Sequence, residues 1–144
     1  MRKRIALAVS LLVILNLQVA HAQVIKGDSI IESLSVEPGD PARGRAIVAS
    51  RQTGLCLLCH SGPFPEERFQ GNLAPELKVS VARLNASQLR ARIVNAAHFN
   101  PQTIMPSYYQ TSNLNRVSSK FAGQTILTGQ EIEDVIAFLV TLNN

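Results

Sequence analysis

Two cysteines and a histidine lie close together in the segment from Thr53 to Gly62, which reads TGLCLLCHSG. Cys56 and Cys59 are the only cysteines of the sequence, and His60 directly follows the second one. Two thiols and an imidazole at this spacing are typical of four arrangements: a disulfide, a redox pair, a zinc site or the covalent attachment of a haem. The rest of the sequence decides between them.

Three of the four arrangements fit the sequence poorly. A disulfide across two residues closes a loop too short to gain much entropic stabilisation, and it leaves His60 unexplained. A thioredoxin-like redox pair needs an α/β sheet, and few segments show the alternating pattern of a strand. A structural zinc needs four ligands, and beyond the N-terminal leader only His98 is left to join a set in which His60 adjoins Cys59.

Covalent attachment of a haem accounts for all three residues. Each cysteine adds to one vinyl group on the same edge of the macrocycle, so the two thiols must lie about one helical turn apart. The histidine after the second cysteine then reaches the iron. We interpret Cys56 and Cys59 as the thioether anchors of one haem c, and His60 as the proximal ligand of its iron.

The opposite axial ligand is expected to be Met105, the one methionine besides the initiator. Met105 lies in the segment TIMPSYY, where Pro106 stiffens the loop. His98 is the less favoured candidate. A Met/His pair closes both axial positions and raises the reduction potential, which favours electron transfer over the binding of oxygen.

The second nitrogen of His60 needs a hydrogen-bond acceptor that fixes the imidazole ring. The carbonyl of Pro63 or of Pro75 is expected to serve. Tyr108 and Tyr109 are candidates to pack on the Met105 side of the haem or to bind a propionate.

Residues 1–22 are typical of a secretory signal peptide, with basic residues from Arg2 to Arg4, an apolar run, and small residues up to a cleavage site after Ala22. Asn16 and Gln18 interrupt the run before it reaches the roughly 20 apolar residues of a membrane span. We therefore expect a periplasmic protein with no membrane span after cleavage.

The net charge of the mature chain excludes two classes of partner. The signal peptide holds three of the 14 Lys and Arg residues, which leaves 11 against 10 Asp and Glu. A net charge of +1, without a run of Lys and Arg residues, provides no positively charged surface that would bind nucleic acid or an anionic membrane.

The sequence predicts an all-α domain over residues 40–144, preceded by an N-terminal extension over residues 23–39. Asp40 is expected to cap a helix that starts at Pro41, in which Gly44 indicates close packing. A second helix is predicted from a Ser87 cap to about Ala97. The proline-bearing segments 62–84 and 98–116 read as loops.

The last predicted helix has the strongest pattern in the sequence. Thr128 and Glu131 form a T-x-x-E capping box. One apolar stripe follows along the helix, made of Ile132, Val135, Ile136, Leu139 and Leu142.

The order of these elements is similar to that of class I cytochromes c, in which a glycine of the first helix crosses an aromatic residue of the last. Gly44 and Phe138 would be that pair. The chain more closely resembles the SoxX family, the monohaem subunits of SoxAX complexes. The resemblance is carried by GLCLLCH, RIVNAAHFNPQTIMPSYY, NLNRV and ILTGQEIEDVIAFLVTL, and covers most of the chain from Asp40 to Leu142.

The resemblance implies a class I cytochrome c-like fold with one covalent haem, and a heterodimer with SoxA. It further implies that the pair acts as L-cysteine S-thiosulfotransferase, which oxidatively couples thiosulfate to a cysteine of the carrier SoxYZ. A soluble cytochrome c would accept the electrons. If both cysteines are bonded to haem, this subunit has no free thiol. We therefore expect the sulfur chemistry to take place on SoxA, and we expect no catalytic residue in this chain.

The sequence also indicates a partner contact in the N-terminal segment and an alternative function. The residues 23–39 contain the apolar segment SIIESLSV and are expected to contact SoxA rather than to close the haem core. The alternative function is a free-standing periplasmic electron shuttle. Such shuttles often carry a ring of lysines, whereas the mature chain has only Lys26, Lys78 and Lys120.

Overall fold

The computed structural model describes residues 23–114 and 116–143, and the predicted signal peptide lies outside them. Within these residues the fold is helical and contains no strand, apart from one isolated bridge between Lys26 and Ser29. This confirms the all-α prediction for the part of the chain that the structure describes. None of the helices found there is both long and apolar enough to cross a bilayer.

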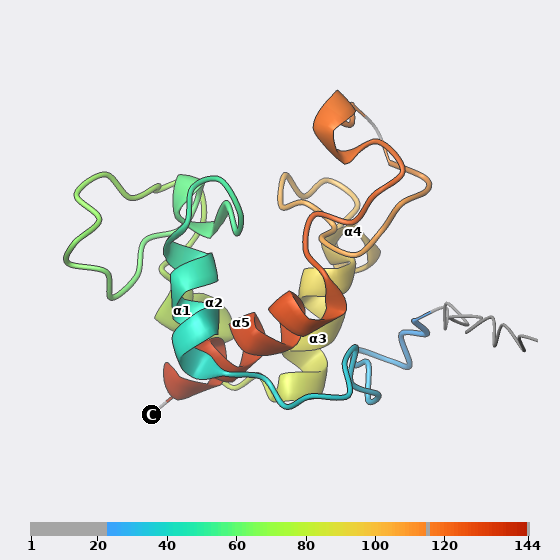
Figure 1. Ribbon diagram of the computed structural model, residues 1–144, viewed down its shortest axis with the longest axis horizontal. Helices are drawn as coiled ribbons and strands as arrows, with labels where there is room; N and C mark the ends of the chain where they lie inside the picture. The colour runs from blue at the N-terminus through green and yellow to red at the C-terminus, as the bar shows by residue number, and fades with distance from the viewer. Residues whose placement is uncertain (1–22, 115, 144) are drawn as a thin grey trace, which may run out of the picture.

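The first and last long helices pack against each other, as Figure 1 shows, and Gly44 lies at their contact. Helix α1 spans Pro41–Ala49 and α5 spans Gly129–Thr141. A methyl group added to Gly44 would overlap the backbone carbonyl of Asp134 and come within 3.0 Å of the Cβ of Phe138. The predicted close packing is therefore present, and only glycine permits it.

The predicted starts of α1 and α5 are confirmed, whereas Leu142, predicted as part of the last helix, is the residue directly after it. The carboxylate of Asp40 accepts a hydrogen bond from the backbone N–H of Arg43 at 2.7 Å, which satisfies one free donor of the first turn. The side chains of Thr128 and Glu131 each accept from the backbone N–H of the other residue. The apolar stripe of α5 faces the core, with Ile132 fully buried.

The middle helix differs from its prediction at both ends. Helix α3 spans Ala86–Val94 and is capped by Asn85, not by Ser87, because Asn85 and Gln88 form the capping box. It stops before Ala97 because Asn95 leaves the helical conformation, with φ −148° and ψ 82°. The side chain of Asn95 then caps the short helix α4, Ala96–Phe99, by accepting from the N–H of His98.

Three further short helical pieces lie between the longer helices, and one of them falls in a segment predicted as loop. They are the 3₁₀ helices η1, Cys56–Leu58, and η2, Ser119–Phe121, and the helix α2, Leu77–Val81. The prediction of loop throughout residues 62–84 is thus wrong for α2. Leu77 and Val81, four residues apart, are both buried, so tertiary packing stabilises a helix that is too short to be stable alone.

The N-terminal segment 23–39 is part of the packed structure. Figure 1 shows it passing one end of α3 on its way to the start of α1. Ile30 is 2% exposed and belongs to the core, and its N–H donates to the carbonyl of Ser87 at 3.0 Å. The expectation that this segment is not needed to close the core is therefore wrong at Ile30. The domain boundary predicted between residues 39 and 40 stays a prediction.

A buried ion pair holds this segment in place. Arg90 of α3 forms two hydrogen bonds to the carboxylate of Glu133 on α5. The remaining nitrogen of its guanidinium donates to the carbonyl of Ile30 at 2.7 Å. Glu133 also accepts from the N–H of Leu34 at 3.0 Å. These bonds satisfy two charges that burial would otherwise make costly.

Candidate functional site

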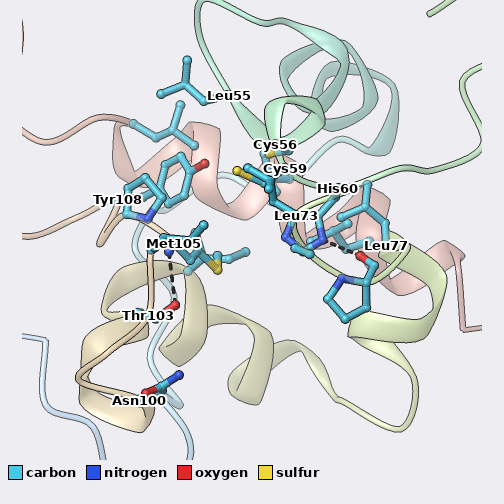
Figure 2. Close-up of a pocket in the computed structure, with 18 of the residues that line it drawn as sticks. Leu55, Cys56, Cys59, His60, Leu73, Leu77, Asn100, Thr103, Met105 and Tyr108 are labelled. Atoms are coloured by element: carbon cyan, nitrogen blue, oxygen red, sulfur yellow. Dashed lines mark hydrogen bonds between the residues drawn. The ribbon is translucent and has the colours of Figure 1, made fainter. Parts of the chain in front are cut away.

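One cavity of about 460 Å³ brings together all four residues predicted to bind haem. Cys56, Cys59, His60 and Met105 all line it, although Met105 is far from the others in the sequence. Figure 2 shows the two cysteines at one end of the cavity, with His60 and Met105 on opposite sides below them. The remaining walls are mainly apolar and include Ile93, Leu127 and Val135.

The two thiols lie one turn apart because residues 56–60 form a tight helical turn. The N–H of Cys59 donates to the carbonyl of Cys56 at 3.2 Å, and the N–H of His60 donates to the same oxygen at 2.9 Å. Leu55 starts the turn in the left-handed conformation, at φ 61°. The spacing that the sequence predicts for two vinyl additions is therefore present.

Neither cysteine is bonded to the other in the structure. Burial raises the pKa of Cys56 to about 11, so its thiol stays protonated at neutral pH. The residues that the structure describes contain no cluster of three His, Cys, Asp or Glu side chains able to hold a metal ion. Cys56 is therefore not an activated thiolate, and the described residues around it offer no zinc ligand set.

The imidazole of His60 is held by the carbonyl of Pro75, whose oxygen lies 2.6 Å from Nδ1. A carbonyl can only accept, so Nδ1 carries the proton and Nε2 is left with a free lone pair. The hydroxyl of Ser80 also donates to the Pro75 carbonyl, at 3.1 Å. Of the two prolines proposed from the sequence, Pro75 is the acceptor, whereas the carbonyl of Pro63 accepts from Arg45 at 3.5 Å.

Met105 is half-buried, and its backbone N–H donates to the side-chain oxygen of Thr103 at 3.1 Å. This bond fixes the loop just before the proline that follows Met105. His98 is exposed, packs edge-on against Phe99 at 5.0 Å between ring centroids, and does not line the cavity. The structure thus brings Met105 to the site and leaves His98 outside it.

The two tyrosines after the Met105 loop differ in their surroundings. Tyr108 lines the cavity and is 4% exposed, and its hydroxyl donates to the carbonyl of Gly54 at 2.6 Å. Tyr109 is only half-buried. The packing of Tyr108 on the Met105 side follows the sequence prediction, but its hydroxyl is bonded to the protein backbone.

Sequence analysis missed Ser80 and Thr103 as supporting residues of the site. Ser80 lies on α2, which was predicted as loop because of the nearby prolines. Its hydroxyl reaches the Pro75 carbonyl because α2 begins directly after Glu76. Thr103 is two residues before Met105, and a Ser or Thr at this spacing often accepts from a backbone N–H. Only the second residue had a signal in the sequence.

The residues of the cavity fit a covalently bound haem. Two thiols lie at one end, the imidazole of His60 and the thioether of Met105 lie on opposite sides, and mainly apolar walls surround them. A structural zinc would need a fourth thiolate, imidazole or carboxylate ligand beside Cys56, Cys59 and His60, and among the described residues none lines the cavity. Its volume is in the range of about 300–1,000 Å³ that is common for ligand and cofactor pockets.

Comparison with known proteins finds a similar chain among the solved structures. No family model and no curated protein matches the chain. Among solved structures, one chain of the crystal structure of SoxXA from P. pantotrophus is 34% identical in sequence. The match covers 84% of this chain and 94% of that chain, and the TM-score is 0.75.

Proposed function

The chain belongs to the SoxX family of Sox-complex cytochromes, and from this premise we propose that it carries one covalent haem c as the electron-transfer subunit of a periplasmic SoxAX complex. The observation that carries this proposal is the convergence of Cys56, Cys59, His60 and Met105 on one cavity. The match to a SoxXA chain supports it independently, because the identity extends over most of both chains.

The haem, when bound, supplies a centre that accepts and releases one electron at a time. Cys56 and Cys59 would anchor it, and His60 would contact the iron through Nε2 because Nδ1 is bonded to Pro75. Met105 would close the opposite position. The mainly apolar walls would surround the haem, and ligation by both His60 and Met105 would favour outer-sphere electron transfer over ligand activation.

The sulfur chemistry is assigned to the partner subunit SoxA. Joining thiosulfate to a thiol forms one S–S bond, releases the thiol proton and removes two electrons. In this chain both sulfurs would already be bonded to haem, so neither can take part. One haem takes one electron, so the second must wait for reoxidation or go to another centre. We propose that the electrons pass to a soluble cytochrome c, and that SoxYZ carries the product.

Reconstitution tests this division of labour. The isolated mature protein is expected to be redox-active but unable to couple thiosulfate to the SoxYZ cysteine. Adding SoxA should restore the coupling and reduce the haem of this subunit. Thiosulfate conjugation by the isolated chain would refute the assignment, and full activity of SoxA without this subunit would refute its role as electron acceptor.

We propose that the N-terminal segment 23–39 contacts SoxA. Substitution of its exposed residues tests this contact better than deletion of the segment. Deleting residues 23–36 would remove Ile30 from the core. Ile31 is 69% exposed and Val36 is fully exposed, so these two side chains are available to a partner. Ile31→Ser with Val36→Ser is expected to weaken co-purification with SoxA and to leave the haem spectrum unchanged. Unimpaired assembly would refute this interface.

A further inference from the structure

The hydroxyl of Tyr108 joins the two loops that carry the proposed haem-binding residues. Gly54, whose carbonyl accepts the bond at 2.6 Å, is two residues before Cys56. Tyr108 is three residues after Met105. One buried hydrogen bond thus connects the loop with the thiols to the loop with the thioether, which are remote in the sequence.

The backbone of Tyr108 is fixed to two other parts of the fold. Its N–H donates to the carbonyl of Ile93, near the end of α3, at 3.0 Å. Its carbonyl accepts from the N–H of Ile126 at 2.9 Å and from that of Leu127 at 3.3 Å. The residue is therefore anchored on α3 and on the segment before α5, and the hydroxyl adds the link to the attachment loop.

Haem attachment makes this link more important. In the free thiol form, the sulfur of Cys56 also donates to the Gly54 carbonyl, at 3.3 Å. A thioether has no S–H, so attachment removes this second donor. Gly54 is buried, and its carbonyl then depends on the Tyr108 hydroxyl. Burial raises the pKa of Tyr108, so the phenol keeps the proton that it donates.

We propose that Tyr108 is a positioning residue that stabilises Met105 as an axial ligand by tying the Met105 loop to the attachment loop. The inference rests on the proposed haem site. Without the hydroxyl, the Gly54 carbonyl is buried and unpaired, and the loop that presents Met105 loses its connection to the opposite side of the cavity.

Competition with imidazole on the holoprotein tests this role. Added imidazole takes the position opposite His60 only where Met105 has left it, so its affinity reports how firmly Met105 is held. Tyr108→Phe keeps the ring and removes only the hydroxyl. The ferric variant is expected to bind imidazole about tenfold more tightly than the wild type, which is the size of effect that one buried hydrogen bond supports.

Tyr109→Phe is the matched control. It removes a hydroxyl from the adjacent residue, and the Tyr109 hydroxyl has no hydrogen-bond partner among residues 23–114 and 116–143. Its imidazole affinity is expected to stay within about twofold of the wild type, as for a substitution that breaks no interaction.

The outcomes separate this inference from the proposed function. Equal imidazole affinity of Tyr108→Phe and wild type would overturn it, even if the variant unfolds at a lower temperature. A similar gain in Tyr109→Phe would overturn it as well. If the wild-type protein binds no covalent haem, or binds haem without Met105, it is the proposed haem site that fails.

Discussion

Arg90 and Glu133 form a two-point ion pair in the interior, with N–O distances of 2.7 and 2.8 Å and each side chain only 8% exposed. The pair joins α3 to α5, and both partners also bond the backbone of the N-terminal segment. It therefore ties the N-terminal segment to α3 and α5, two helices that line the cavity.

Arg90→Ala is expected to lower the free energy of unfolding by about 3–5 kcal/mol, because it leaves the Glu133 carboxylate buried without its partner. The control is Arg92→Ala on the same helix, which is expected to cost less than about 1 kcal/mol. Denaturant unfolding followed by circular dichroism measures both. Replacing the pair by Arg90→Met with Glu133→Leu should recover part of the loss, because it removes the unpaired charge although the Ile30 carbonyl and the Leu34 N–H lose their partners. A double variant as unstable as Arg90→Ala would contradict this explanation.

Asp134 predicts an acid-dependent loss of stability. The ion pair with Arg43 lowers the pKa of Asp134 to about 2, and the N–H of Asp40 and the amide of Gln130 assist it. In the unfolded chain this carboxyl takes up a proton near pH 3.8, so the stabilisation is complete above that pH. It is lost as the pH falls from about 4 to about 2.

Asp134→Asn should therefore unfold more easily than the wild type at neutral pH. Its unfolding temperature should also depend less on pH between about 4 and about 2. Thermal unfolding at a series of pH values gives the slope for each protein. Identical slopes for variant and wild type would show that another carboxyl controls the acid transition.

Met105→Ala tests the distal ligand. The ferric wild-type holoprotein is expected to show the weak long-wavelength charge-transfer band of an iron–thioether bond. The substitution should abolish the band and lower the reduction potential, because a thioether stabilises the ferrous state more than water or a nitrogen ligand does. His98→Ala is the control and should change neither. Loss of low-spin ligation in His98→Ala, with Met105→Ala unchanged, would contradict the assignment.

The parts of the fold that the sequence predicted well depend on local patterns. The caps at Asp40 and Thr128, and the turn that carries Cys56, Cys59 and His60, are set by residues within a few positions of each other. The cap of α3 was misplaced at Ser87, although Asn85 with Gln88 three residues later has the capping-box spacing. A stricter use of that local pattern would have found it.

The remaining features depend on contacts between distant residues. The Arg90–Glu133 pair and the bond from Arg90 to Ile30 span 43 and 60 positions, and no sequence pattern indicates either. The same holds for the bond from Tyr108 to Gly54, which spans 54 positions. Charged residues are rarely buried, so Arg90 and Glu133 read as surface residues until their partners are known.

Mass spectrometry of the purified holoprotein under denaturing conditions shows directly whether the haem is covalently attached. The mature chain is expected to carry the added mass of one haem, and a peptide containing Cys56 and Cys59 should retain that mass after proteolysis. Acid-acetone should leave the haem on the protein. Cys56→Ser with Cys59→Ser should lose the added mass entirely. A wild-type chain of unmodified mass, or one whose haem is extracted by acid-acetone, would show that Cys56 and Cys59 do not anchor a haem.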